Sequence, residues 1–76
     1  ITLYPNPTEG LFEIAIPINL QEVSIELYNS SAQLIFSESY PINYGKVQLD
    51  LSNQANGIYL VKVLVEQPIS LKIIKQ

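Results

Sequence analysis

The chain has 76 residues, which is enough for one small domain and leaves no room for a second. Hydrophobic residues make up 47% of it, charged residues only 14%, and the net charge is −3 with four Lys and no Arg. This balance argues against nucleic acid and against an anionic membrane surface as partners, because both bind clustered cations.

The residue types that are missing exclude several kinds of site. Without Cys there is no disulfide framework, so the core must hold by packing alone. Without His or Cys, zinc and copper lack their usual ligands and a nucleophile–His pair is impossible. The acidic residues are spread along the chain, and no apolar run reaches the ~20 residues of a membrane helix. We therefore predict no enzyme, no cofactor, no metal and no direct membrane insertion.

The first predicted element is a short strand over residues 1–4, followed by a proline-rich turn. Pro5 and Pro7 each fix φ, remove a backbone donor and push the preceding residue into an extended conformation. The segment 5–8 can therefore be neither helix nor a strand in the middle of a sheet. Gly10 then supplies the positive φ that a tight turn often needs.

The next four strands, 11–16, 23–28, 34–40 and 46–51, follow from alternation of apolar and polar residues. A period of two places every second side chain on the same face of a strand. The fourth of the seven predicted strands, 34–40, is too uniformly apolar at its start to assign faces. In the other three, the apolar face consists of Phe12, Ile14, Ile16, Val23, Ile25, Leu27, Val47, Leu49 and Leu51.

The C-terminal third supplies the last two strands. The pair Asn56-Gly57 is a strong turn signal, and the longest apolar run, 58–65, follows it with only Lys62 as an interruption. Such a run is typical of a central strand with both faces covered. After a turn at Pro68, residues 71–74 form the last strand. About seven strands without a helix-period segment predict an all-β fold, an antiparallel β-sandwich.

Tyr59 matches the pattern of a tyrosine corner. Leu51, then a loop, then Gly57 and Tyr59 at a strand start is the form in which the phenol hydroxyl bonds back to the loop backbone. The alternative is a Tyr that simply packs in the core. Either role is structural.

Three segments, taken in order, resemble a known family. They are Tyr4–Phe12, then Asp50–Ser52 with Gly57–Val63, and finally Lys72–Gln76. Their order, spacing and total length are similar to those of the type A C-terminal sorting domain of the type IX secretion system, the Por secretion system of Bacteroidetes. The resemblance covers essentially the whole chain.

The resemblance implies an immunoglobulin-like sandwich at the C-terminus of a larger exported protein. Such a domain directs its cargo from the periplasm through the outer-membrane translocon with the help of shuttle proteins. A sortase-like surface protease then removes it in many members, and the cargo is attached to anionic lipopolysaccharide or released. Because the chain starts with Ile1 rather than Met, we expect 1–76 to be a single domain cut from such a protein.

The resemblance also suggests which residues carry the signal. We expect the translocon to read the terminal strand and its lysines together with the face near the prolines. The alternatives are that the prolines only shape a turn and that the lysines are ordinary solvated residues. The predicted sorting-signal motif consists of Tyr4, Pro5, Asn6, Pro7, Gly10, Gly57, Ile58, Tyr59, Lys72, Ile73, Ile74 and Lys75.

One turn departs from the family pattern. Where the family usually has Asp-x-x-Gly, this chain has Asn29 to Ala32. Asn29 can replace Asp as a turn former. Ala32 cannot replace Gly where positive φ is required, so we predict a turn of another type.

Two other functions compete with the sorting role. A carbohydrate-binding module would use exposed aromatic rings, and Tyr28, Tyr40 and Tyr44 are candidates to stack on sugars. A flat platform of coplanar rings would favour that function, and scattered rings would weaken it. A passive spacer of the fibronectin type III kind would need further chain on both sides.

Overall fold

The computed structural model describes all of residues 1–76 and contains seven β-strands and no helix, which confirms the all-β prediction. No helix is therefore present that could cross a membrane. The predicted strand starts and ends agree with the structure to within about two residues. The strands are β1 (Thr2–Tyr4), β2 (Leu11–Ala15), β3 (Glu22–Asn29), β4 (Leu34–Pro41), β5 (Lys46–Asp50), β6 (Gly57–Leu64) and β7 (Ile69–Lys75).

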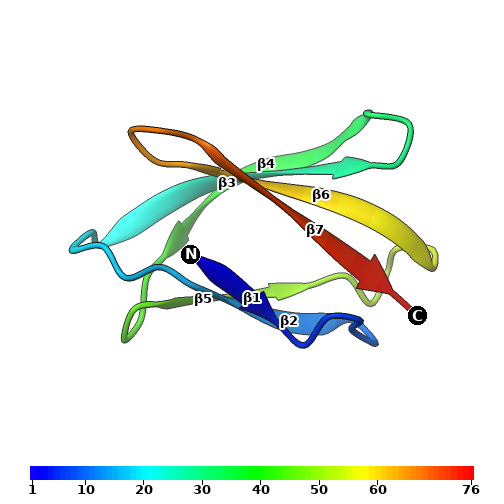
Figure 1. Ribbon diagram of the computed structural model, residues 1–76, viewed down its shortest axis with the longest axis horizontal. Helices are drawn as coiled ribbons and strands as arrows, with labels where there is room; N and C mark the ends of the chain where they lie inside the picture. The colour runs from blue at the N-terminus through cyan, green and yellow to red at the C-terminus, as the bar shows by residue number, and fades with distance from the viewer.

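The strands form two antiparallel sheets that lie face to face (Figure 1). One sheet has the order β1-β2-β5 and the other has the order β4-β3-β6-β7. The chain changes sheet between β2 and β3, between β4 and β5, and between β5 and β6. This arrangement confirms the predicted antiparallel sandwich of the immunoglobulin-like kind.

The core lies between the two sheets and is filled by inward-facing side chains at alternate positions of the strands. All nine apolar residues that the alternation predicted are buried. The two C-terminal strands add four more side chains to this core. They are Tyr59, Val61, Val63 and Ile73.

The prediction for the longest apolar run is correct in one respect and wrong in another. The strand it forms, β6, is central, because it pairs with both β3 and β7. Its outer face, however, is not covered: Ile58 is 49% exposed and Leu60 is 40% exposed. A central strand is flanked by neighbours within its own sheet, but only a further layer can cover the second face, and a two-layer sandwich has none.

The turn after β3 is also not as predicted. Ala32 has a φ of 62°, so the chain adopts the left-handed conformation there in spite of the Cβ. Asn29 stabilises it, since its Oδ1 accepts the N–H groups of Ser31 at 2.9 Å and Gln33 at 3.0 Å. Its carbonyl also accepts the Ala32 N–H at 3.0 Å. These bonds offset the roughly 1–2 kcal/mol that the left-handed conformation costs a residue other than Gly. The role predicted for Asn29 is confirmed.

Candidate functional site: the end of the sandwich where the three segments meet

The proline-rich segment lies against the end of the terminal strand, although 66 or more residues separate them in the sequence (Figure 1). The Asn6 side chain bonds to the backbone on both sides of Ile73. Its Nδ2 donates to the Lys72 carbonyl at 3.0 Å, and its Oδ1 accepts the Ile74 N–H at 3.0 Å. The peptide bonds before Pro5 and Pro7 are both cis, and the segment between them belongs to neither sheet.

Thr8 continues this contact and is almost completely buried, at 2% exposure. Its N–H donates to the Ile74 carbonyl at 2.8 Å, and its carbonyl accepts the Gln76 N–H at 2.9 Å. Its Oγ1 donates to the Leu11 carbonyl at 2.6 Å and accepts the Gly10 N–H at 3.0 Å. Sequence reasoning missed Thr8, although a Thr two residues before a turn Gly is a signal for such a side-chain–backbone turn.

The strand β7 lies at the edge of its sheet. Its C-terminal half is nevertheless capped by Asn6 and Thr8, which take up backbone groups that an added strand would use. Only its first part, Ile69–Leu71, has no hydrogen-bonding partner other than β6.

The middle segment of the predicted motif lies at the same end. Gly57, Ile58 and Tyr59 open β6 and stand opposite the last three residues of β7. The Tyr59 hydroxyl donates to the Ala55 carbonyl at 2.5 Å, and its ring is 6% exposed. The predicted tyrosine corner is therefore confirmed, and it fixes the loop that leads into β6.

The two lysines of the terminal segment have different environments. Their spacing of three places them on opposite faces of β7. Lys72 is exposed on the outer face of the sheet, whereas Lys75 is on the inner side and only 9% exposed. The Lys75 ammonium donates to Oδ1 of Asn56 at 2.9 Å. The alternative of ordinary solvated residues is thus wrong for Lys75, whose amine links the end of β7 to the loop before β6.

Gly10 joins the proline-rich segment to the end of β5. Its carbonyl accepts the Leu51 N–H at 2.8 Å. A Cβ at Gly10 would lie only 2.5 Å from Oγ of Ser52, so the close approach requires Gly. Ser52 is in turn held by Asp50, whose Oδ1 accepts its N–H at 2.8 Å and its hydroxyl at 2.5 Å. These hydrogen bonds from Ser52 hold the pKa of the Asp50 carboxyl below its ordinary value.

Tyr4 belongs to the predicted motif, but its hydroxyl bonds to side chains outside the junction of the three segments. Its hydroxyl donates to Oε2 of Glu13 at 2.8 Å and accepts from Nζ of Lys46 at 3.2 Å. Both partners lie on the three-stranded sheet to which Tyr4 itself belongs, and not on β6 or β7. Lys46 and Glu13 also form an ion pair at 3.6 Å. The hydrogen bond to Tyr4, helped by the Glu13 carboxylate, raises the pKa of Lys46.

The tyrosines proposed for sugar binding do not share a surface. Tyr28 lies on the outer face of β3, and its hydroxyl donates to Oε1 of Glu26 at 2.9 Å. Tyr40 is partly buried and packs against the core, whereas Tyr44 projects fully into solvent from the turn after β4. Rings in three such different places form no flat platform, which weakens the carbohydrate-binding hypothesis.

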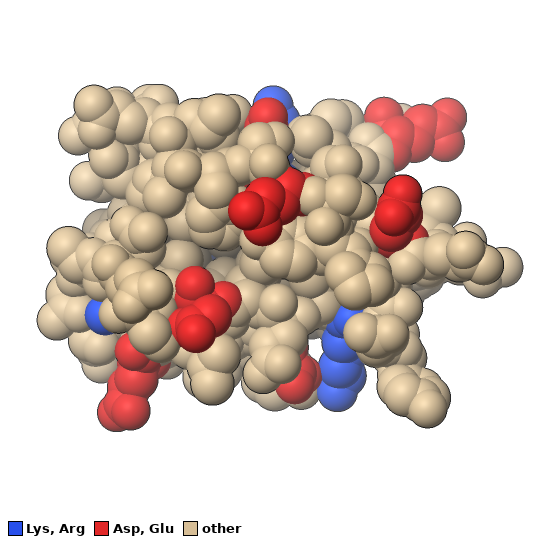
Figure 2. Space-filling model, turned by 180° about the vertical axis from the view of Figure 1, so that it is seen from behind, with Lys and Arg blue, Asp and Glu red and all other residues tan.

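Charged groups are dispersed rather than gathered into a site. Figure 2 shows acidic side chains separated from one another over one face of the molecule. No group of three or more side chains of the metal-binding types lies together. The junction of the three segments is therefore characterised by its shape and its network of hydrogen bonds, and not by a cluster of charged side chains.

The family comparison agrees with this geometry. The sequence model of the family described as "Secretion system C-terminal sorting domain" matches residues 2–76. The chain belongs to this family. No curated protein matches the chain. As a member of this family, the chain is a non-catalytic secretion signal of the type IX secretion system, and its cargo is secreted or displayed at the cell surface.

Proposed function

We propose that the chain is a type A sorting domain at the C-terminus of a larger exported protein. In this proposal it holds its cargo in an export-competent form in the periplasm until the translocon and its shuttle proteins bind it. A sortase-like protease at the cell surface then removes it, and the cargo is anchored or released. The match to the sorting-domain family over residues 2–76 supports this proposal.

We further propose that the machinery recognises the junction of the three segments as one surface. The observation that supports this is the convergence itself: Asn6 and Thr8 bond to β7, Lys75 bonds to Asn56, and the start of β6 pairs with the end of β7. Residues far apart in the sequence thus create a single contiguous shape.

A shared translocon must recognise many unrelated cargo proteins, so its signal must present the same shape on each. The hydrogen bonds of Asn6 and Thr8 hold that shape before the receptor arrives. A pre-organised surface pays less ordering entropy on binding than a flexible tail does. The sorting domain therefore works as a rigid label, with recognition carried by loops and strand ends.

A fusion assay tests the sorting role. The chain is placed at the C-terminus of a fluorescent reporter with a periplasmic signal peptide, in a Bacteroidetes host with or without the type IX machinery. We expect reporter outside the cell only when the machinery is present. Retention of the folded fusion in the periplasm of both strains would refute the function.

Point variants test the proposed surface better than a deletion does. Removing Leu71–Gln76 would take away the buried Ile73 and the anchored Lys75, so it would unfold the domain as well as remove a signal. Asn6→Ala instead removes the link to β7 and keeps the core. We expect it to reduce export more than Asn19→Ala, an exposed Asn without a side-chain hydrogen bond. Equal export of the two folded fusions would contradict recognition of this junction.

A further inference from the structure

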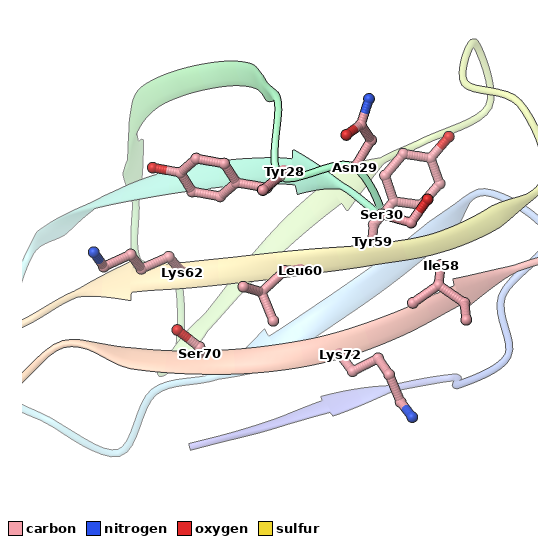
Figure 3. A pocket seen from close by; sticks show the side chains of 10 residues that line it. Tyr28, Asn29, Ser30, Ile58, Tyr59, Leu60, Lys62, Ser70 and Lys72 are labelled. Atoms are coloured by element: carbon pink, nitrogen blue, oxygen red, sulfur yellow. The ribbon is translucent and has the colours of Figure 1, made fainter.

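The outer face of the four-stranded sheet carries a groove beside the junction of the three segments. It has a volume of about 450 Å³ and lies over the end of β3 and the first parts of β6 and β7 (Figure 3). Its floor includes Ile58 and Leu60, two of the more exposed large apolar side chains of the chain. We call it the outer-face groove; its lining residues are Tyr28, Asn29, Ser30, Ala32, Ile58, Tyr59, Leu60, Lys62, Ser70 and Lys72.

The charge of this groove is opposite to that of the whole domain. Its lining contains Lys62 and Lys72 but no Asp or Glu, although the chain has a net charge of −3. The other two lysines have partners within the domain: Lys46 pairs with Glu13, and Lys75 bonds to Asn56. The side chains of Lys62 and Lys72 make no hydrogen bond or ion pair within the domain, and both line the same partly apolar groove. Glu26 stands opposite Lys62 on β3 but is not part of the lining.

We propose that the outer-face groove binds an extended, acidic and apolar peptide segment of the secretion machinery. Apolar side chains of that segment would pack on Ile58 and Leu60, and its carboxylates would face Lys62 and Lys72. The proposal rests on the proposed function, since it names the chemistry of the partner. The partner would then contact the outer face of the four-stranded sheet in addition to the junction of the three segments.

Two features favour a peptide over an anionic lipid. The groove crosses the sheet beside Ile69–Leu71, the part of the β7 edge that neither Asn6 nor Thr8 caps. A peptide crossing the groove can reach backbone groups there, whereas a lipid headgroup would leave them unused. Two single lysines are also fewer than the cluster of basic residues that attraction to an anionic membrane requires.

The chain contains no Cys, which allows a site-specific test of the groove. A single Cys is placed at Leu60 in a cysteine-free reporter fusion and is labelled with benzophenone-maleimide. The matched control carries the label at Leu20, which is 44% exposed but lies in the loop before β3, outside the groove and outside the three segments. Both fusions are irradiated with outer membranes from hosts with and without the machinery, and the crosslinked peptides are identified by mass spectrometry.

We expect the Leu60 label to crosslink an acidic and apolar segment of a type IX component at least about five-fold more than the Leu20 label, as a defined contact predicts. Equal crosslinking of the two labels would overturn the proposal. So would crosslinking at Leu60 to a glycolipid or to a segment without carboxylates. The proposed function would survive each of these results as long as the unlabelled fusion is still exported.

Charge reversal gives an independent readout. Lys62→Glu and Lys72→Glu should each lower the Leu60 crosslink about five-fold or more, because each turns an attraction into a repulsion. Lys46→Glu changes the net charge equally, at an exposed site outside the groove, and should leave the crosslink within about two-fold. Equal effects of all three variants would show that net charge, and not the groove, determines binding, and would refute the proposal.

Discussion

The close approach of Gly10 to Ser52 gives the sharpest test of how the N-terminal segment is built. Gly10→Ala would place a Cβ 2.5 Å from Oγ and 3.3 Å from both Cα and N of Ser52. Gly57→Ala is a matched control, because Gly57 has nearly the same φ, 155° against 157°, but nothing lies within 4 Å of its added Cβ. The backbone strain is therefore common to both variants, and the clash is specific to Gly10.

The size of the difference follows from the steric conflict alone. Forcing an extra carbon into a filled site typically costs about 1–3 kcal/mol. The Ser52 side chain cannot turn away freely, because its hydroxyl donates to Asp50. We therefore expect Gly10→Ala to lower the free energy of unfolding by about 2 kcal/mol more than Gly57→Ala. In a domain of this size that difference lowers Tm by a further 8–16 °C or so.

Thermal unfolding of the purified fusions, followed by circular dichroism, measures this difference. The double variant Gly10→Ala/Ser52→Ala removes the nearest atom and should recover part of the lost Tm, although the backbone of Ser52 stays close. A difference of about 1 kcal/mol would separate the two Tm values by more than about 2 °C. If Gly10→Ala and Gly57→Ala unfold within about 2 °C of each other, the clash therefore does not destabilise the domain and the prediction is refuted.

Three further predictions concern two hydrogen-bonding side chains and one titrating side chain. Tyr59→Phe removes the corner hydroxyl and should lower the free energy of unfolding by about 1–2 kcal/mol, whereas Tyr44→Phe, at a fully exposed ring, should not change Tm. Asn6→Ala loses two exposed hydrogen bonds and should lower the free energy of unfolding, measured with urea, by about 1 kcal/mol. If this free energy is the same in Asn6→Ala and Asn19→Ala, water replaces both hydrogen bonds fully and the prediction is wrong. Burial raises the pKa of Tyr40 from 10.0 to about 12, so the unfolded chain ionises first and stability is lost as pH rises between these values. Tyr40→Phe should make Tm fall less steeply over that range, and an unchanged slope would show that this phenol does not contribute.

Some parts of the candidate site could be predicted from the sequence because they depend on local chemistry. The Gly57-x-Tyr59 pattern was enough to predict the corner, because the Tyr hydroxyl bonds to a residue only four positions away. The alternation of apolar residues predicted which side chains fill the core. The same period of two also places Lys72 and Lys75 on opposite faces, a consequence that the hypothesis of jointly read lysines did not take into account.

Contacts between distant segments could not be predicted in this way. Nothing near Asn6 or Thr8 in the sequence indicates that they cap β7, because their partners lie 66 or more residues away. The exposure of Ile58 and Leu60 was missed for a related reason. An apolar run shows that a strand is rich in hydrophobic residues, but not how many layers cover it.

The sequence by itself determined the strands, the all-β class, the core face of most strands, the corner and the family. Each of these follows from the side-chain period, from local turn chemistry or from motifs read in order. Only the tertiary structure decided that three motif segments form one junction, that Lys75 is anchored while Lys72 is free, and that a basic, partly apolar groove crosses the outer face. These features depend on which strands pair and which face is left without a covering layer, and both are settled when the two sheets pack.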